Sequence, residues 1–163
     1  MKSVMTLILV FSSLSVFALD LNLAQGTSFM TKWYSYWDMV SDETHGAAAQ
    51  AWLLSNVSKQ DLHMTYSKLV NTKVEFAAFL KFLADTKTTS QHEVLAMKKI
   101  DHRTFQFVVR FYSQSSSRPD LNGSCLINVR FTEDGTEKLM IDRYEITKMI
   151  SPNSKIDLLL EEK

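Results

Sequence analysis

The order of hydrophobic patterns along this 163-residue chain predicts an α+β fold. Residues 28–83 contain apolar residues at the three- and four-residue spacing of buried helix faces, whereas residues 93–150 contain four runs typical of strands. Helices followed by consecutive strands predict one mostly antiparallel sheet with three N-terminal helices packed on one face. That arrangement commonly encloses a pocket.

The first helix is expected to begin after Ser28, a residue type that caps helices. Its buried face consists of Met30, Trp33, Tyr34, Trp37 and Val40. Residues 19–27 are interpreted as a leader that precedes the domain.

Ser41-Asp42-Glu43 indicates the start of a second helix, because negative charge is favourable at a helix N-terminus. Ala47, Ala48, Ala51 and Leu54 would form its narrow packing face. Leu62–Tyr66 then alternates between apolar and polar residues, which predicts a short strand.

The third helix has the clearest local signal in the chain. Thr72 and Glu75 have the spacing of a capping box, in which each side chain accepts a hydrogen bond from the other residue's backbone N–H. The buried stripe that follows comprises Phe76, Phe79, Leu80 and Leu83, and the helix should end near Asp85.

Four longer strands are expected at residues 93–100, 104–113, 125–131 and 138–150. Residues 113–123 form a long polar loop in this interpretation, and Gly135 allows a hairpin turn at residues 133–136.

This element order resembles the nuclear transport factor 2-like superfamily, which includes ketosteroid isomerases and scytalone dehydratase. The resemblance rests on the aromatic first helix, the strand at 62–66 that leads into the helix at 72–83, and the hairpins closed at His102 and Gly135. It covers residues 28–150 and implies a strongly curved sheet that forms a cone with the helices. It also implies a homodimer through the outer sheet face. Because that superfamily contains both enzymes and proteins without known activity, the fold does not decide the function.

Residues 1–18 have the pattern of a secretory signal peptide, with Lys2, an apolar stretch and Ala18 at the cleavage site. An uncleaved anchor is the alternative. We therefore expect a secreted, extracellular protein without a membrane segment after signal removal. Asn56 and Asn122 begin glycosylation sequons, and residues 151–163 form a C-terminal tail.

The charge balance argues against a nucleic-acid partner, because the chain has 18 basic and 18 acidic residues. The four histidines and the single Cys125 show no metal-binding spacing, and no phosphate-binding loop is present. We accordingly expect no metal and no cofactor.

Asp142 and Tyr144 are weak catalytic candidates, because both lie on one face of the last expected strand. If this face points inward, desolvation would raise the pKa of Asp142 and suit it to proton transfer. Alternatively, the opposite face points inward, or Asp142 pairs with Arg110 or Arg130.

The candidate ligand-binding residues are Trp33, Tyr34, Trp37, Phe107, Asp142 and Tyr144. The aromatic members either line a pocket or fill a solid core. The favoured hypothesis is a secreted, non-enzymatic domain that binds a small apolar ligand or a protein partner. The alternatives are an isomerase- or dehydratase-like proton-transfer enzyme and a structural dimer module.

Overall fold

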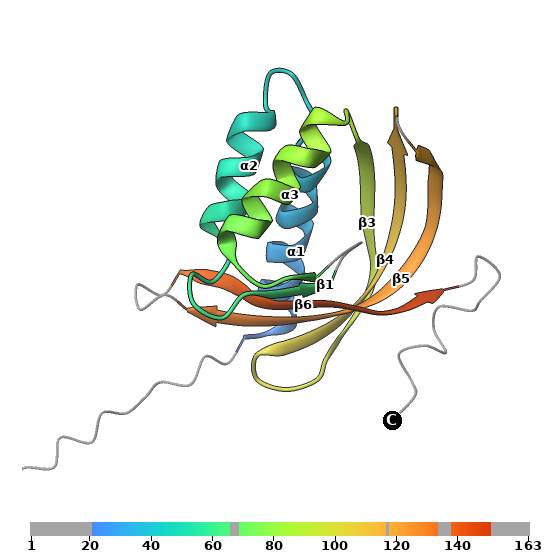
Figure 1. Cartoon of the computed structure of the whole chain (residues 1–163). Helices are drawn as coiled ribbons and strands as arrows, with labels where there is room; N and C mark the ends of the chain where they lie inside the picture. Colours follow the sequence, from blue (N-terminus) through green and yellow to red (C-terminus); the bar gives the residue numbers. More distant parts are fainter. Residues whose placement is uncertain (1–20, 66–68, 117, 134–137, 151–163) are drawn as a thin grey trace, which may run out of the picture.

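The structure is a computed structural model that describes residues 21–65, 69–116, 118–133 and 138–150. Within these ranges it contains three α-helices and one six-stranded mixed sheet (Figure 1), which confirms the predicted α+β class. The strand order in the sheet is β2-β1-β6-β5-β4-β3. The predicted signal peptide, the turn at Gly135 and the C-terminal tail lie outside the described residues.

Helix α1 (Leu23–Asp38) begins earlier than predicted. The Asn22 side chain accepts a hydrogen bond from the Gln25 backbone N–H at 2.9 Å, and Gln25 Oε1 accepts one from the Asn22 N–H at 3.0 Å. This capping box starts the helix before Ser28. Residues 23–27 therefore belong to the helix, and their assignment to a leader was wrong.

Helix α2 (Gly46–Ser55) begins later than the predicted start at residues 41–43, and its predicted face was wrong. Ala49 and Leu53 are buried, whereas Ala47, Ala48 and Ala51 are exposed. Because this helix is apolar on most sides, hydrophobic spacing could not identify the face that packs inward.

Helix α3 (Lys73–Asp85) confirms the predicted capping box and buried stripe. Thr72 Oγ1 accepts from the Glu75 N–H at 3.1 Å, and a Glu75 carboxylate oxygen accepts from the Thr72 N–H at 3.0 Å. The helix ends at Asp85, as predicted, and Lys87 follows with a positive φ of 46°.

The strands are β1 (His63–Thr65), β2 (Leu69–Val70), β3 (Thr89–Lys99), β4 (Thr104–Ser115), β5 (Arg118–Glu133) and β6 (Leu139–Ile150). β1 pairs with β6 in parallel, and the other pairs of these strands are antiparallel. The predicted loop at 113–123 was wrong, because Ser115 already pairs with Arg118 across a tight β4–β5 connection. The polar side chains of this region are compatible with strands because the backbone hydrogen bonds form the ladder.

The helices lie against one face of the sheet (Figure 1) and share its hydrophobic core. A Cβ placed on Gly26 in α1 would lie 3.4 Å from the Phe105 ring, so the helix approaches β4 closely. Phe29 also packs edge-on against Phe131 of β5, with ring centroids 5.3 Å apart. These contacts place α1 over the strands that form the inner face.

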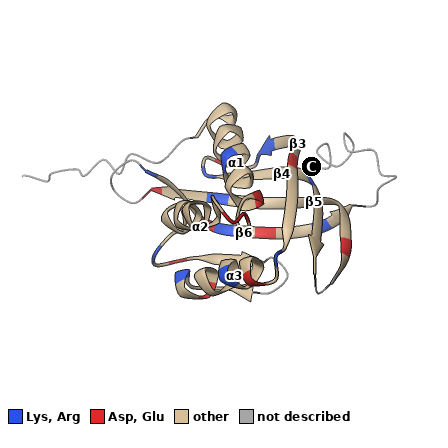
Figure 2. Cartoon of the chain, turned by 90° about the horizontal axis from the view of Figure 1, so that it is seen from above, with Lys and Arg blue, Asp and Glu red and all other residues tan. Residues whose placement is uncertain are grey.

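Charged residues of both signs are interspersed along α3 and along β5 and β6 (Figure 2), in agreement with the balanced composition. Within the described ranges, no helix combines the length and apolarity needed to span a bilayer.

Candidate functional site

A cavity of about 200 Å³ lies between α1, α3 and the inner face of the sheet. Most of its wall is apolar and consists of Trp37, Val40, Phe79, Leu83, Phe111, Leu121, Cys125, Ile127, Ile146 and Met149. The polar groups on the wall come from Thr88, Ser90, His92, Ser113 and Tyr144. Leu121 and Met149 are more than half exposed, at 53% and 60%, which places them at the solvent side of the cavity.

The strongest polar feature of this wall is His92, a buried histidine that pairs with the partly exposed carboxylate of Asp38. His92 Nδ1 lies 2.6 Å from Asp38 Oδ1, and the His92 backbone N–H donates to Asp38 Oδ2 at 2.9 Å. The His92 side chain is only 4% exposed, and that of Asp38 is 24% exposed. Both carboxylate oxygens therefore fix the position of His92.

The Asp38 contacts leave the second ring nitrogen of His92 available. Within the described part of the chain, Nε2 of His92 makes no hydrogen bond, and the residue forms part of the cavity wall. A histidine held at Nδ1 by a carboxylate presents Nε2 in a defined orientation, as a hydrogen-bonding or proton-transferring group requires.

Two tyrosines extend this polar arrangement. The Tyr34 ring stacks on the His92 ring with centroids 4.8 Å apart, and its hydroxyl lies 3.0 Å from the Tyr144 hydroxyl. Both tyrosines are 2% exposed. Tyr144 lines the cavity, while Tyr34 lies behind His92 and limits the ring's movement.

The local sequence explains why these groups meet. Asp38 is the last residue of α1, and His92 lies on β3 opposite Phe111 of β4. His92 and Val94 point to the same face of β3, because side chains alternate along a strand. Packing of α1 on β3 then brings the carboxylate to the imidazole, although 54 positions separate them in the chain.

Cys125 lines the same cavity but is not an activated nucleophile. Its side chain is buried, and burial raises the pKa of the thiol to about 11. Because the thiolate is the reactive form, the Cys125 sulfur acts as a small apolar group at neutral pH.

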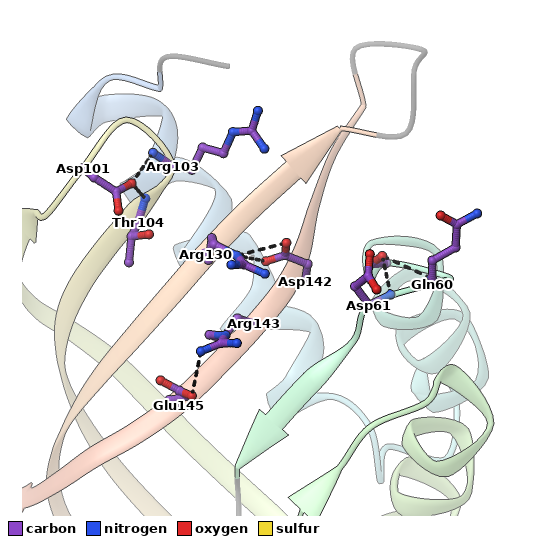
Figure 3. Close-up of polar contacts among 10 residues, drawn as sticks. Gln60, Asp61, Asp101, Arg103, Thr104, Arg130, Asp142, Arg143 and Glu145 are labelled. Atoms are coloured by element: carbon purple, nitrogen blue, oxygen red, sulfur yellow. Dashed lines mark hydrogen bonds and ion pairs between the residues drawn. The ribbon is translucent and has the colours of Figure 1, made fainter. Parts of the chain in front are cut away.

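Asp142, by contrast, does not lie in the cavity. Arg130 Nε donates to its two carboxylate oxygens at 2.9 and 3.1 Å (Figure 3). This hydrogen bond is the main cause that raises the pKa of Arg130. The pairing with Arg130, one of the alternatives left open by the sequence, is therefore the one observed.

A β-bulge explains why the strand alternation gave the wrong face for Asp142. Phe131 pairs with Ile141 and Arg130 pairs with Arg143, so Asp142 is an extra residue in β6. A bulge shifts the alternation by one residue. Ile141 and Tyr144 are consequently both buried, and Asp142 and Tyr144 do not share a face.

The other candidate ligand-binding residues fall into two groups. Trp37 and Tyr144 line the cavity, whereas Trp33 and Phe107 are fully buried core residues outside its lining. No role was assigned to Asp38 or His92 from the sequence. The sequence gives only a weak indication of this pair, because the predicted strand began at Glu93 and so did not include His92.

The two glycosylation sequons differ in how exposed their asparagine side chains are. Asn56 is 6% exposed, and its amide nitrogen donates to the Trp52 carbonyl at 2.6 Å, so the folded protein has no room for a glycan there. Asn122 is exposed, although it lies within β5 rather than in the loop predicted at residues 113–123. The burial of Asn56 disfavours a glycan there, and glycosylation at both sites stays a prediction.

Among the described residues, no group of three or more His, Cys, Asp or Glu side chains is arranged to hold a metal ion. The polar side chains on the cavity wall are those of His92, Tyr144, Thr88, Ser90 and Ser113, and Asp38 and Tyr34 contact His92 from outside the lining.

No family model matches the chain, and no curated protein matches it by sequence. Solved structures do share its fold. ActVI-ORFA from Streptomyces coelicolor has a TM-score of 0.56 at 12% identity, and the match covers 76% of this chain and 94% of that chain. A protein from Catenulispora acidiphila, solved in complex with S-DNPA, has a TM-score of 0.57 at 9% identity and covers 76% and 90%.

An NTF2-like protein of unknown function from Exiguobacterium sp. 255-15 has a TM-score of 0.56 at 11% identity, covering 71% of this chain and 92% of that chain. These similarities establish a nuclear transport factor 2-like fold, as the resemblance in sequence pattern predicted. At this level of identity they define the fold alone.

Proposed function

We propose that the protein binds a small, uncharged and mainly apolar molecule that carries one hydroxyl or carbonyl group. The observation that supports this proposal best is the cavity of about 200 Å³ with His92 held by Asp38 on its wall. A dry protein cavity of about 150 Å³ accommodates benzene, so one substituted ring is a suitable size. In this proposal the sheet and the helices form a cone around the ligand.

The polar groups define which part of the ligand is recognised. Nε2 of His92 and the hydroxyl of Tyr144 would contact the ligand's single polar group, while Phe111, Ile127 and Ile146 would cover its ring. No lysine or arginine lines the cavity, so its described wall offers a carboxylate no permanent positive partner. The Catenulispora protein, solved in complex with S-DNPA, gives a precedent for ligand binding by a protein of this fold.

A matched set of probes tests the proposal. p-Cresol, toluene and p-toluate have the same ring and differ in the polar group. We expect p-cresol to shift the NMR signals of His92, Tyr144 and Cys125, and p-toluate to leave them unchanged. Tyr144→Phe should weaken p-cresol binding about 5- to 10-fold and leave toluene binding unaffected, because it removes one hydrogen bond. Equal binding of all three probes would contradict the assignment.

Proton transfer is a second candidate function, and the His92–Asp38 pair specifically favours it. Asp38 accepts the Nδ1 hydrogen bond and orients the ring, so that Nε2 can remove a proton from carbon next to a bound carbonyl. The Tyr144 hydroxyl would donate a hydrogen bond to the oxygen that becomes negative. The proton then returns from Nε2 to another atom of the ligand.

Deuterium uptake by acetophenone distinguishes this activity from binding alone. In D₂O, an active protein should accelerate exchange of the acetophenone methyl protons, and His92→Gln should reduce that rate by at least about 100-fold. If the wild-type protein leaves the buffer rate unchanged while still binding p-cresol, the binding function stands without catalysis.

Secretion is part of the proposed function and is supported by the signal-peptide pattern of residues 1–18. Mass spectrometry of the protein from culture medium should find Leu19 as the first residue and a glycan at Asn122 but not at Asn56. Retention of residues 1–18 on a membrane-bound product would favour the anchor instead.

We further propose a homodimer through the outer sheet face, because the helices cover only the opposite face (Figure 1). Sedimentation at rising protein concentration tests it. A dimer is expected, and a monomer at every concentration would contradict it.

A further inference from the structure

A second concave region lies on the opposite end of α1 from the Asp38–His92 pair. This groove, of about 660 Å³, is lined by residues from the first part of α1, the end of α2 and the neighbouring ends of β5 and β6. Its apolar part consists of Leu21, Ala24, Phe29, Trp52 and Leu139. Its charged lining consists of Lys32, Lys138 and Glu133.

Both lysines are held in position by uncharged groups. The Lys32 ammonium lies 5.3 Å from the centre of the Trp52 ring, a cation–π contact. Lys138 Nζ donates to the Ser55 carbonyl at 2.7 Å and so binds the end of α2. Within the described residues, neither ammonium forms an ion pair.

Further positive charge surrounds the Lys138 end of the groove. Burial, and then the nearby Lys59 and Lys138 ammonium groups, lower the pKa of Lys73. Lys73 is therefore repelled by both other lysines, and among the described residues that line the groove two lysines face one carboxylate, Glu133. An anion placed here would reduce that repulsion.

The groove also offers an aromatic surface, and its uncharged polar lining consists of Asn22, Gln25, Ser28 and Asn56. Trp52 is half-buried and stacks on Tyr36 with ring centroids 4.4 Å apart, so its ring orientation is fixed. The Asn56 amide nitrogen donates to Trp52 and Ser55, which orients the amide whose residue lines the groove. Ordered aromatic surface next to fixed positive charge suits a molecule with both an apolar body and an anionic group.

We propose that this groove binds small amphipathic carboxylates, with the anionic group at Lys32 and Lys138 and the apolar body over Trp52 and Phe29. This site is separate from the cavity at His92, and it differs in the ligand class that it selects. The inner cavity selects a neutral polar group, whereas the groove selects a negative one.

Octanoate and octanol below their aggregation concentrations test the proposal, because they share a chain and differ in charge. Octanoate should shift the Trp52 indole N–H signal, with octanol binding at least about 5-fold more weakly. Lys138→Gln and Lys32→Gln should each weaken octanoate binding by a similar factor, about 5-fold. Lys81→Gln, which removes a lysine paired with Asp85 on α3, should leave the affinity unchanged.

Three results would overturn the proposal. They are equal binding of octanoate and octanol, an unchanged dissociation constant in both groove variants, and octanoate shifts at His92 and Tyr144 without any at Trp52. Thermal unfolding of each variant checks folding. If Lys138→Gln does not fold, octanoate binding is compared between Lys32→Gln, which loses a positive charge, and Lys138→Arg, which keeps it.

Discussion

At the residue scale, two carboxylates differ in the face of the sheet near which they lie. Asp38 pairs with His92 on one face, and Asp142 pairs with Arg130 on the other. Asp38 contacts a histidine on the cavity wall, while Asp142 is an extra residue in β6 that pairs with an arginine whose side chain is 40% exposed. Partly exposed ion pairs contribute little to stability. Because Asp38 contacts a residue of the cavity wall and Asp142 does not, we expect only Asp38 to affect ligand binding.

Substitution of the two aspartates tests this distinction. Asp142→Asn should lower the free energy of unfolding by no more than about 1 kcal/mol and leave p-cresol binding unchanged. Asp38→Asn should weaken p-cresol binding, because the His92 ring loses the carboxylate that orients it. NMR titration of both variants makes the comparison, and the reverse order of effects would show that the site is wrongly placed.

Cys125 gives a pH-dependent prediction. Its pKa is about 11 in the folded protein, against an ordinary value of 9.0. Between these values the unfolded thiol releases its proton and the folded one keeps it, so the free energy of unfolding should fall as pH rises from about 9 to about 11. Urea unfolding of wild type and Cys125→Val isolates this contribution. A parallel pH dependence in the two proteins would contradict the assigned burial effect.

At the element scale, local signals predicted α3 well because its start, stripe and end all lie within a few residues. Thr72→Ala should lower the free energy of unfolding by about 1 kcal/mol, since it removes the side-chain acceptor of the Glu75 N–H. Thr72→Ser keeps the hydroxyl and is the matched control. Equal losses in the two variants, measured by urea unfolding, would mean that the cap is not the cause.

Other elements were harder to predict for identifiable reasons. Asn22 and Ser28 are both acceptable caps for α1, and the choice depends on the reciprocal contact with Gln25. The start of β5 lies in a polar segment whose only strand signal is its pairing with β4. β2 has two residues, which is too short for any periodic pattern.

The candidate site was less predictable than the fold. Tyr144 and Trp37 were identified from strand and helix periodicity, and both line the cavity. The contact of Asp38 with His92 depends on the packing of two elements, so no local pattern contains it. The bulge at Asp142 likewise leaves no mark in the alternation of apolar and polar residues.

At the scale of the whole molecule, the three helices and the inner sheet face share one hydrophobic core that stops short of filling the space beside His92. The α1 helix connects the two proposed binding regions, since its last residue holds His92 and its first turns border the groove at Trp52. A neutral ligand at one end and an anionic one at the other would thus bind to opposite ends of the same helix.

The most direct test of the central claim is a crystal structure of the protein soaked with p-cresol. We expect density for one ring among Phe111, Ile127 and Ile146, with the phenol oxygen within hydrogen-bonding distance of His92 Nε2 or the Tyr144 hydroxyl. An empty cavity at saturating p-cresol, or a space closed by side chains, would contradict the account.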